Sequence, residues 1–218
     1  MNRAQAMHTI RADSVAPQPW RNGGGQTREL LAWPDATHWQ LRISRADIEA
    51  SGPFSAFVGV QRWFVVLSGK GVVLHLPTAD QHTLDHVLLP GHIPLHFDGG
   101  LAPGCTLLDG PTQDLNLMAR GGQAGMLAVN TGVPWRAHFA QCGIYTARSG
   151  VCSTGHRRYH LAAHSLLWLA PAPATALRFR ADDAAAGADA PCAWWLGFTP
   201  QASTPQALTH QTAPCPTP

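Results

Sequence analysis

Charged side chains are scarce in this 218-residue sequence, and segments that favour helix are scarcer still. Asp, Glu, Lys and Arg make up 13% of the chain, about half of the usual quarter. Turn-forming residues are abundant instead, with 21 glycines and 18 prolines. Because glycine and proline interrupt helices and mark turns, this composition favours β structure. The length is sufficient for a hydrophobic core that needs no covalent staple.

The sequence also lacks a concentration of positive charge. Its formal net charge is +2, and the densest basic cluster is "HRRYH" at residues 156–160. Proteins that follow a nucleic-acid backbone need a basic patch of several lysines and arginines. Nucleic acid is therefore not expected among the partners of this protein.

Long apolar runs and paired cysteines are missing as well. Runs such as "WFVVL" and "SLLWLAPAPA" are too short to cross a bilayer, and residues 1–17 lack the apolar core of a signal peptide. We therefore expect no membrane partner and predict a soluble cytoplasmic protein. The five cysteines are widely spaced without a CxxC pair, which argues against a disulfide framework or a zinc ribbon.

Short segments rich in apolar and β-branched residues recur along the chain, separated by turn residues. The clearest lies at 62–76, where two apolar runs flank Ser-Gly-Lys-Gly and predict a β-hairpin. Further strands are predicted at 27–33, 39–45, 82–89, 93–97, 105–109, 114–120, 125–129, 143–149, 160–170, 176–181 and 192–198. Many short strands at this spacing predict a sandwich or barrel.

Little of the chain is expected outside strands and their turns. Residues 45–52 and 182–190 are the only plausible helical turns, and the second is better interpreted as a surface loop. The Pro, Thr and Gln content of residues 199–218 predicts a flexible C-terminal tail.

Two of the predicted strands alternate in character, which places two kinds of residue on opposite faces. The apolar positions are Leu41, Ile43, Leu115 and Leu117, and the positions that oppose them are Gln40, Arg42, Ser44, Asp114, Asn116 and Met118. Two interpretations stay open. The polar faces either meet water, as on most antiparallel sheets, or line a barrel mouth that holds a small polar ligand. In the second case Arg42 is the natural carboxylate clamp.

Twelve histidines raise the question of a metal site. "HTLDH" places His82 and His86 on one face of a predicted strand, about 13 Å apart, which is too far to bind one ion. "HIPLHF" and "HRRYH" have the same separation, so no metal site is expected. A G-x-S-x-G nucleophile motif is also missing, so nucleophilic catalysis has little support.

The run Gly23–Gly25 follows Asn22 and precedes a predicted strand. It matches no nucleotide-binding motif, because the Lys-Ser/Thr ending and the following helix are both missing. One role is a close approach to a neighbouring strand or to a pocket rim. The other is an anion nest, in which converging N–H groups help Arg42 hold a carboxylate.

Three stretches resemble the HutD/Ves family of cupin-like proteins: "WRNGGGQTREL" at 20–30, "LRISRADIEASGPFSAFVGVQRWFVVLSGKG" at 41–71 and "DLNLMARGG" at 114–122. The resemblance implies an all-β, cupin-like fold, an RmlC-like jelly-roll β-barrel, with two cupin-like halves in one compact chain. On this basis we expect one domain over residues 1–198, with halves at 1–130 and 131–198.

The resemblance also implies a function without an established enzymatic activity. HutD members are thought to bind a small carboxylate metabolite, such as formylglutamate, urocanate or a formate-like molecule, and to modulate histidine utilisation. The ligand-binding residues that it implies are Asn22, Arg42, Ser44, Phe54, Ser55, Arg62, Asp114 and Asn116. The cupin metal signature, two histidines one residue apart followed by Glu, is missing. No metal or other cofactor is therefore expected.

Other functions stay open beside this one. The main alternative is a cupin-type enzyme, an isomerase or hydrolase, that is metal-independent or uses an atypical metal site. A third is an interaction protein with an exposed patch of Trp and Leu, including "AWWLGF" at 193–198. Whether the chain forms a homodimer, and to which branch of the family it belongs, is also left open.

Overall fold

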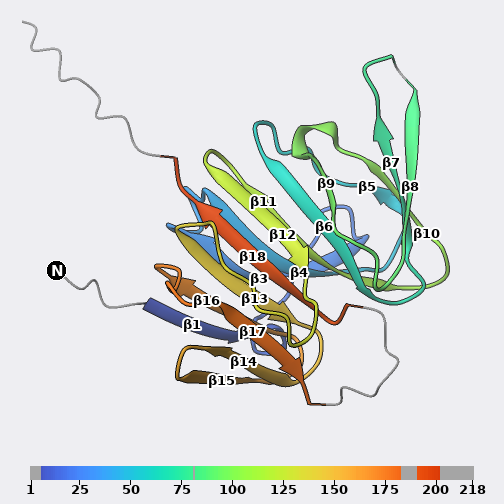
Figure 1. Cartoon of the computed structure of the whole chain (residues 1–218). Helices are drawn as coiled ribbons and strands as arrows, with labels where there is room; N and C mark the ends of the chain where they lie inside the picture. The colour runs from blue at the N-terminus through green and yellow to red at the C-terminus, as the bar shows by residue number, and fades with distance from the viewer. Residues whose placement is uncertain (1–5, 81, 183–190, 202–218) are drawn as a thin grey trace, which may run out of the picture.

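Four β-sheets stack in one direction through the molecule (Figure 1). The computed structural model describes residues 6–80, 82–182 and 191–201, which hold eighteen strands and two 3₁₀ helices of three residues each. The helices are η1 (Ala12–Ser14) and η2 (Gly99–Leu101). The predicted all-β class is therefore confirmed. Among the described residues, no helix has the length and apolar character needed to cross a bilayer.

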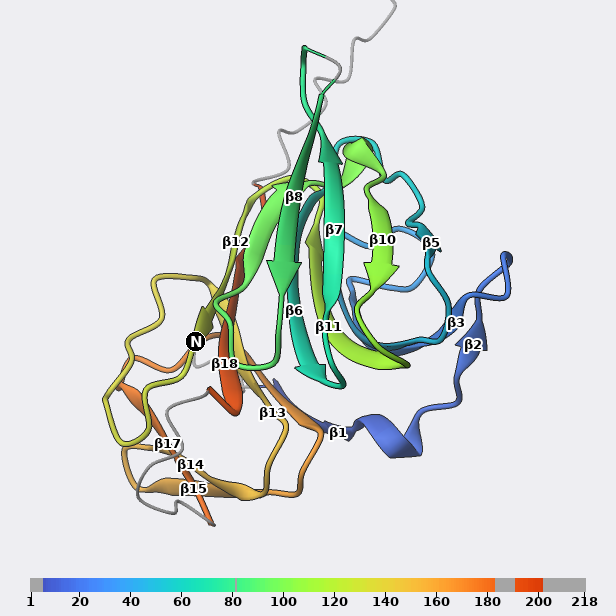
Figure 2. The ribbon, with the colours of Figure 1, turned by 90° about the vertical axis from the view of Figure 1, so that its right-hand side faces the viewer.

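Two sheets build the first half of the molecule, and we call them the first outer and first inner sheets. The first outer sheet has the order β5 (Gly52–Pro53), β10 (Gly104–Leu107), β7 (Val72–Pro77), β8 (Thr83–Leu88). The first inner sheet has the order β2 (Gln18–Pro19), β3 (Gly25–Trp33), β4 (Leu41–Ile48), β11 (Thr112–Ala119), β6 (Gln61–Ser68), β9 (Leu95–Asp98). Figure 2 shows β7, β8 and β10 in front of β6 and β11.

The second half repeats this arrangement with its own pair of sheets. The second inner sheet has the order β1 (Ala6–Arg11), β16 (Ser165–Ala170), β13 (Gln141–Thr146), β18 (Ala193–Thr199), β12 (Gln123–Ala128). The second outer sheet has the order β15 (Arg157–Leu161), β14 (Gly150–Thr154), β17 (Leu177–Ala181). In the described residues each half is thus a sandwich of two separate sheets, rather than a barrel closed by hydrogen bonds.

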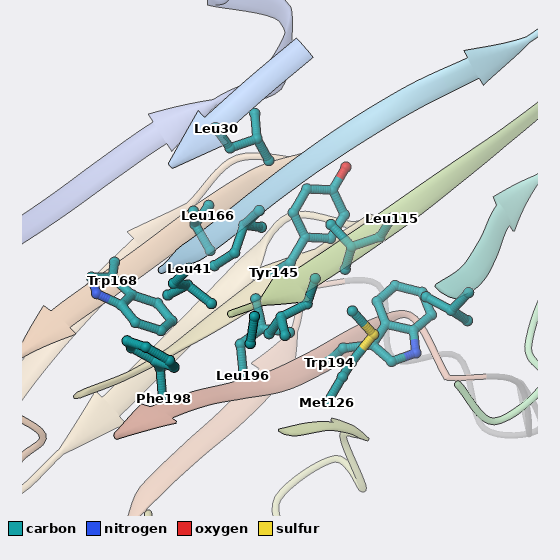
Figure 3. Close-up of a cluster of buried hydrophobic side chains, with 14 of the residues drawn as sticks. Leu30, Leu41, Leu115, Met126, Tyr145, Leu166, Trp168, Trp194, Leu196 and Phe198 are labelled. Atoms are coloured by element: carbon teal, nitrogen blue, oxygen red, sulfur yellow. The ribbon is translucent and has the colours of Figure 1, made fainter. Parts of the chain in front are cut away.

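Three apolar clusters fill the spaces between these layers. One lies inside the first sandwich, around Phe64 and Leu74, and another inside the second, around Phe179 and Trp195. The third joins the two inner sheets, where leucines of β4 and β11 meet Tyr145 and other side chains of the second half (Figure 3). Burial of this shared face makes one compact chain of the two halves.

The strand pairing divides the chain differently from the expected boundary at residue 130. Strands β1 and β12 lie before that boundary, yet both are paired within the second inner sheet. The N-terminal strand therefore crosses to the second half before the chain builds the first. The structure adds four strands to the predicted set, β1, β2, β5 and β14. The predicted strand 160–170 is interrupted, because β15 ends at Leu161 and β16 begins at Ser165.

The predicted hairpin at 62–76 is wrong. β6 pairs with β11 and β9, whereas β7 pairs with β10 and β8, so the Ser-Gly-Lys-Gly turn connects two different sheets. The apolar residues of both strands instead meet face to face inside the first sandwich, where their burial stabilises the fold. Gly69 and Gly71 permit this turn, with φ of +94° and +99°.

The predicted helical turn at 45–52 is also wrong, because β4 continues to Ile48 and pairs on both sides, with β3 and β11. Hydrogen bonding to a strand on each side outweighs the weak helical preference of residues 45–48. Of the other segments without predicted strands, residues 183–190 and 202–218 lie outside the described residues. Thr199, the expected first residue of the tail, ends β18.

Candidate functional site

A pocket of about 640 Å³ opens over the first inner sheet, on the face turned toward the first outer sheet. Neighbouring strands β4, β11 and β6 provide its floor. Their register sets Met118 opposite both Arg42 and Arg62, and sets Asn116 opposite Ser44. Since neighbouring strands lie about 4.8 Å apart, the backbones of the two arginines stand roughly 10 Å apart across the floor. Alternation along the strands explains why these polar side chains share one face.

Seven of the eight residues expected from the resemblance line this pocket: Asn22, Arg42, Ser44, Phe54, Ser55, Arg62 and Asn116. The eighth, Asp114, is 1% exposed and does not line the pocket, although it lies on the same face of the sheet, opposite Ala46 and Val66. The pocket wall comes from residues 18–22 and 53–57. The Trp20 indole Nε1 donates a 2.7 Å hydrogen bond to the Thr27 hydroxyl, and its ring meets Phe54 edge-on. These contacts hold the wall against the floor.

Arg62 is the most enclosed cation of the pocket, with 7% of its surface exposed. Its guanidinium carbon lies 4.5 Å from the ring centre of Phe54, 5.9 Å from that of Phe64 and 5.6 Å from that of Phe97. Cation–π attraction and packing therefore fix its orientation. Burial lowers the pKa of Arg62 to about 10, so the group stays positively charged at neutral pH.

The Arg62 side chain makes one hydrogen bond within the described part of the chain. Nε donates to Asn116 Oδ1 at 2.7 Å, and neither terminal Nη group forms a hydrogen bond or ion pair with the described residues. Since Nε can only donate, the carbonyl end of the Asn116 amide must face it. The amide Nδ2 then faces Asp114 and donates to its carboxyl Oδ1. Burial raises the pKa of Asp114 to about 8, although the nearby Arg62 charge acts in the opposite direction.

Arg42, the clamp expected from alternation, has a carboxylate partner already. Its Nε donates to Glu29 Oε2 at 2.7 Å, and both side chains are about one-fifth exposed. This pair partly neutralises Arg42. The remaining Arg42 charge still lowers the pKa of Arg62, so the two cations share one electrostatic environment. The pocket therefore has a positive floor, with the uncompensated charge on Arg62.

The glycine run serves the fold rather than an anion. The Gly23 N–H donates to the Trp20 carbonyl at 3.0 Å, and the Gly24 N–H donates to Asn22 Oδ1 at 3.1 Å. Two of the three N–H groups are thus used inside the turn, and the anion-nest hypothesis is wrong for them. A Cβ atom at Gly25 would overlap the Asp47 carbonyl oxygen. The run therefore makes a tight turn and a close contact with a neighbouring strand, which is the first of the two roles expected from the sequence.

Four of the five residues of "HTLDH", Thr83 to His86, lie on strand β8, as predicted, and His82 precedes the strand. Asp85 Oδ1 is 2.7 Å from the His75 ring Nδ1, and the other ring nitrogen is 2.8 Å from the Thr106 hydroxyl. These contacts tie β8, β7 and β10 together on a solvent face. Within residues 6–80, 82–182 and 191–201, no group of three or more His, Cys, Asp or Glu side chains is placed to hold a metal ion. Three of the cysteines, Cys105, Cys142 and Cys152, are buried thiols.

Sequence reasoning missed Glu29, which pairs with a residue of the pocket but does not line it, and Phe57, which lines it. Glu29 had no assigned role, although it stands opposite Ser44 in the β3–β4 register and pairs with Arg42. Its only sequence signal is an acidic residue inside an otherwise apolar segment, 29–33. Phe57 lines the pocket from a loop, where alternation gives no information.

The stacked sandwiches define a protein of the two-half cupin fold. Oxalate decarboxylase of Bacillus subtilis has the same fold, with a TM-score of 0.60 over 88% of this chain and 76% of that one, at 8% identity. The chain belongs to the HutD family, whose sequence model matches residues 12–187. The predicted resemblance is therefore confirmed.

Curated relatives agree with this assignment over part of the sequence. Protein Ves of Citrobacter koseri is 42% identical over 105 residues, which is 46% of this chain and 51% of that protein. An uncharacterized 21.2 kDa protein in the hutC 3′ region of Pseudomonas putida is 37% identical over 116 residues, which is 51% of this chain and 57% of that protein. The chain thus spans about half the length of the curated relatives that it matches.

Solved structures match over almost the whole length. A conserved protein of unknown function from Pseudomonas aeruginosa has a TM-score of 0.77 and 25% identity, over 89% of this chain and 99% of that one. HutD from Pseudomonas fluorescens has a TM-score of 0.74 and 24% identity, over 90% of this chain and 100% of that one.

Proposed function

We propose that this protein binds a small carboxylate in the pocket of its first half, with Arg62 as the principal contact. The observation that supports this most directly is a buried, positively charged guanidinium with one protein hydrogen bond and a free edge toward a pocket. A guanidinium edge matches the two oxygens of a carboxylate. The low exposure strengthens the attraction, because less water screens it.

The neighbouring residues have distinct roles in this proposal. Asn116 holds Arg62 in place through Nε, and the Ser44 hydroxyl can donate to a ligand oxygen. Arg42 contributes positive charge from the far side of the floor, reduced by Glu29. The aromatic wall around Phe54 covers the apolar part of a small metabolite.

The identity of the ligand is the finer part of the proposal. A relative is named by its position beside hutC, and HutD of P. fluorescens has been solved in a formate condition. We propose formylglutamate, urocanate or a formate-like carboxylate as ligand, and a cytoplasmic role in modulating histidine utilisation.

The test is isothermal titration calorimetry and thermal unfolding of the full chain with N-formylglutamate, urocanate and formate. A ligand at 100 times its Kd stabilises the folded state by about 2.7 kcal/mol. Arg62→Met should weaken binding by roughly 10- to 150-fold, the range for a lost charged hydrogen bond. Arg180→Met is the matched control, because Arg180 is exposed on β17 in the second half.

Two results would overturn the proposal. One is the absence of binding by all three compounds, and the other is equal binding by the wild-type protein and Arg62→Met. NMR of the ligand after incubation separates binding from turnover. Recovery of the unchanged ligand is expected, whereas a product would favour the alternative of a cupin-type isomerase or hydrolase.

A further inference from the structure

Asp114 lies on the same face of β11 as Asn116 but does not line the pocket, so it can act on a ligand only through other residues. It is on the central strand β11, 1% exposed and opposite Ala46 and Val66 of the flanking strands. Its one side-chain hydrogen bond in the described residues comes from Asn116 Nδ2. No arginine or lysine of these residues forms an ion pair with it. A buried carboxylate with so little compensation is expensive to keep ionised.

We propose that Asp114 is a positioning residue that acts through Asn116 and takes up a proton when Arg62 binds a carboxylate. This rests on the proposed function of the same pocket. In the ligand-free protein, the positive charge of Arg62 favours ionised Asp114. A ligand carboxylate on the Nη edge neutralises that charge, so the pKa of Asp114 rises further above its ligand-free value of about 8, and at a pH near or above that value a proton binds to Asp114.

Ligand and proton are therefore linked in both directions. If ligand binding increases the affinity of Asp114 for a proton, protonation of Asp114 must increase the affinity for the ligand by the same factor. Affinity for a carboxylate is expected to decrease as the pH rises through the range in which Asp114 loses its proton. One linked proton limits this change to about tenfold per pH unit.

Four titratable side chains from four strands interact electrostatically with Asp114, and only one of them, Arg62, lines the pocket. Arg62 on β6 lowers the pKa of Asp114, and Asp47 on β4 raises it. Cys105 on β10 and Tyr145 on β13 also interact with Asp114. Burial raises the pKa of Cys105 to about 12 and that of Tyr145 higher still, so neither changes charge in the same range. Arg62 is thus the group through which a ligand acts on Asp114.

Asn116 provides the mechanical part of the connection. Its amide bridges the two groups, accepting from Arg62 Nε and donating to the Asp114 carboxyl. Asp114 therefore holds the amide in the orientation that Arg62 requires. Asp114→Asn keeps the shape of the side chain and a carbonyl oxygen for Asn116 Nδ2, but it cannot take up a proton. It is the matched variant for the proton, while Asn116→Ala removes the bridge.

The experiment is calorimetry with N-formylglutamate as the probe, in HEPES and in Tris, which differ in ionisation enthalpy, at pH values from about 7 to 8.5. For the wild-type protein, the binding enthalpy should differ between the buffers by an amount that corresponds to uptake of up to one proton. Its Kd should rise by up to about tenfold per unit above the pKa of Asp114. Asp114→Asn should bind with no proton uptake and with little dependence of Kd on pH.

A direct measurement of the pKa of Asp114, which does not need the Asp114→Asn variant, keeps the test decisive even if that variant folds poorly. The pKa of Asp114, followed by carboxyl ¹³C NMR, should rise in Arg62→Met and rise in the wild-type protein when the probe is added. Binding without proton uptake, or a pKa of Asp114 that is unchanged in both comparisons, overturns this proposal and leaves the carboxylate site intact. Failure of the probe, urocanate and formate to bind the wild-type protein overturns the proposed function and this proposal together.

Discussion

The two halves of the molecule share an architecture and differ in what fills it. In the first sandwich, polar side chains of β4, β11 and β6 face inward beside the apolar cluster and leave a pocket. In the second, the corresponding space contains buried Cys142, Phe179 and Trp195, and Trp195 stacks on Trp135 with ring centres 5.0 Å apart. The same pair of sheets can therefore either enclose a pocket or be filled by apolar core. Which of the two occurs depends on the few side chains that face inward.

The halves are nevertheless not independent. They share the apolar face between the inner sheets, and strand β1 leads directly into η1, whose Asp13 forms a 2.9 Å ion pair with buried Arg45 of β4. Loss of the second core should therefore unfold the first half as well. The half with the pocket and the half with the filled core can therefore be compared by the effect of substitutions in each on the stability of the whole chain.

Trp195→Ala should have the largest effect on stability. The side chain is 3% exposed, and truncation of a buried tryptophan lowers the free energy of unfolding by about 3–5 kcal/mol. Urea unfolding followed by circular dichroism measures the loss. Val133→Ala, at a position 52% exposed in the same half, should change stability by less than about 0.5 kcal/mol. A loss below 1 kcal/mol in Trp195→Ala would contradict the structural role of the second core.

Gly25→Ala should have the next largest effect, about 1–3 kcal/mol, because the new Cβ overlaps the Asp47 carbonyl and pushes β3 from β4. Gly23→Ala is the control in the same turn. It has open space around it, and only the strain of φ +69° lowers its stability, by about 1 kcal/mol. Equal losses in the two variants, measured by urea unfolding, would show that close packing at Gly25 is unimportant.

The pH dependence of stability should depend on Asp114. Its folded pKa of about 8 lies above the unfolded value of about 3.9, so the folded state binds more protons between these values. The free energy of unfolding therefore falls as the pH rises from about 4 to 8, by at most about 1.4 kcal/mol per unit, and levels off above that range. Asp114→Asn should lack this contribution. Unfolding curves of the two proteins at pH 6, 7 and 9 test this, and parallel pH profiles would contradict it.

Arg62→Met should have the smallest effect on stability, within about 1 kcal/mol, although it has the largest effect expected on binding. A methionine of similar length can pack among the three phenylalanines, and Arg62 forms no ion pair in the described residues, so the main loss is its hydrogen bond to Asn116, about 1 kcal/mol. Thermal unfolding without ligand measures it, with Arg180→Met as the control. A loss as large as that of Trp195→Ala would mean that Arg62 is part of the core rather than of a binding site.

Much of the fold and part of the pocket could be predicted from local patterns. Alternation placed Leu41 and Leu115 in the core and Arg42 and Asn116 on the opposite face, as the structure has them. The partner of each strand was beyond such patterns. The false hairpin at 62–76 shows why, since a Gly-rich turn fits both a hairpin and a connection between two sheets.

By itself the sequence determined the all-β class, most strand positions, the family and the set of polar residues that could meet a ligand. Those properties depend on composition and on the two-residue period of a strand, which are local. Only the tertiary structure decided that Arg42 is paired with Glu29, that Arg62 lines the pocket with its Nε held by Asn116 and that Asp114 is buried beside it. Burial and charge pairing depend on strands far apart in sequence, and they decide which of several similar polar residues can bind an anion.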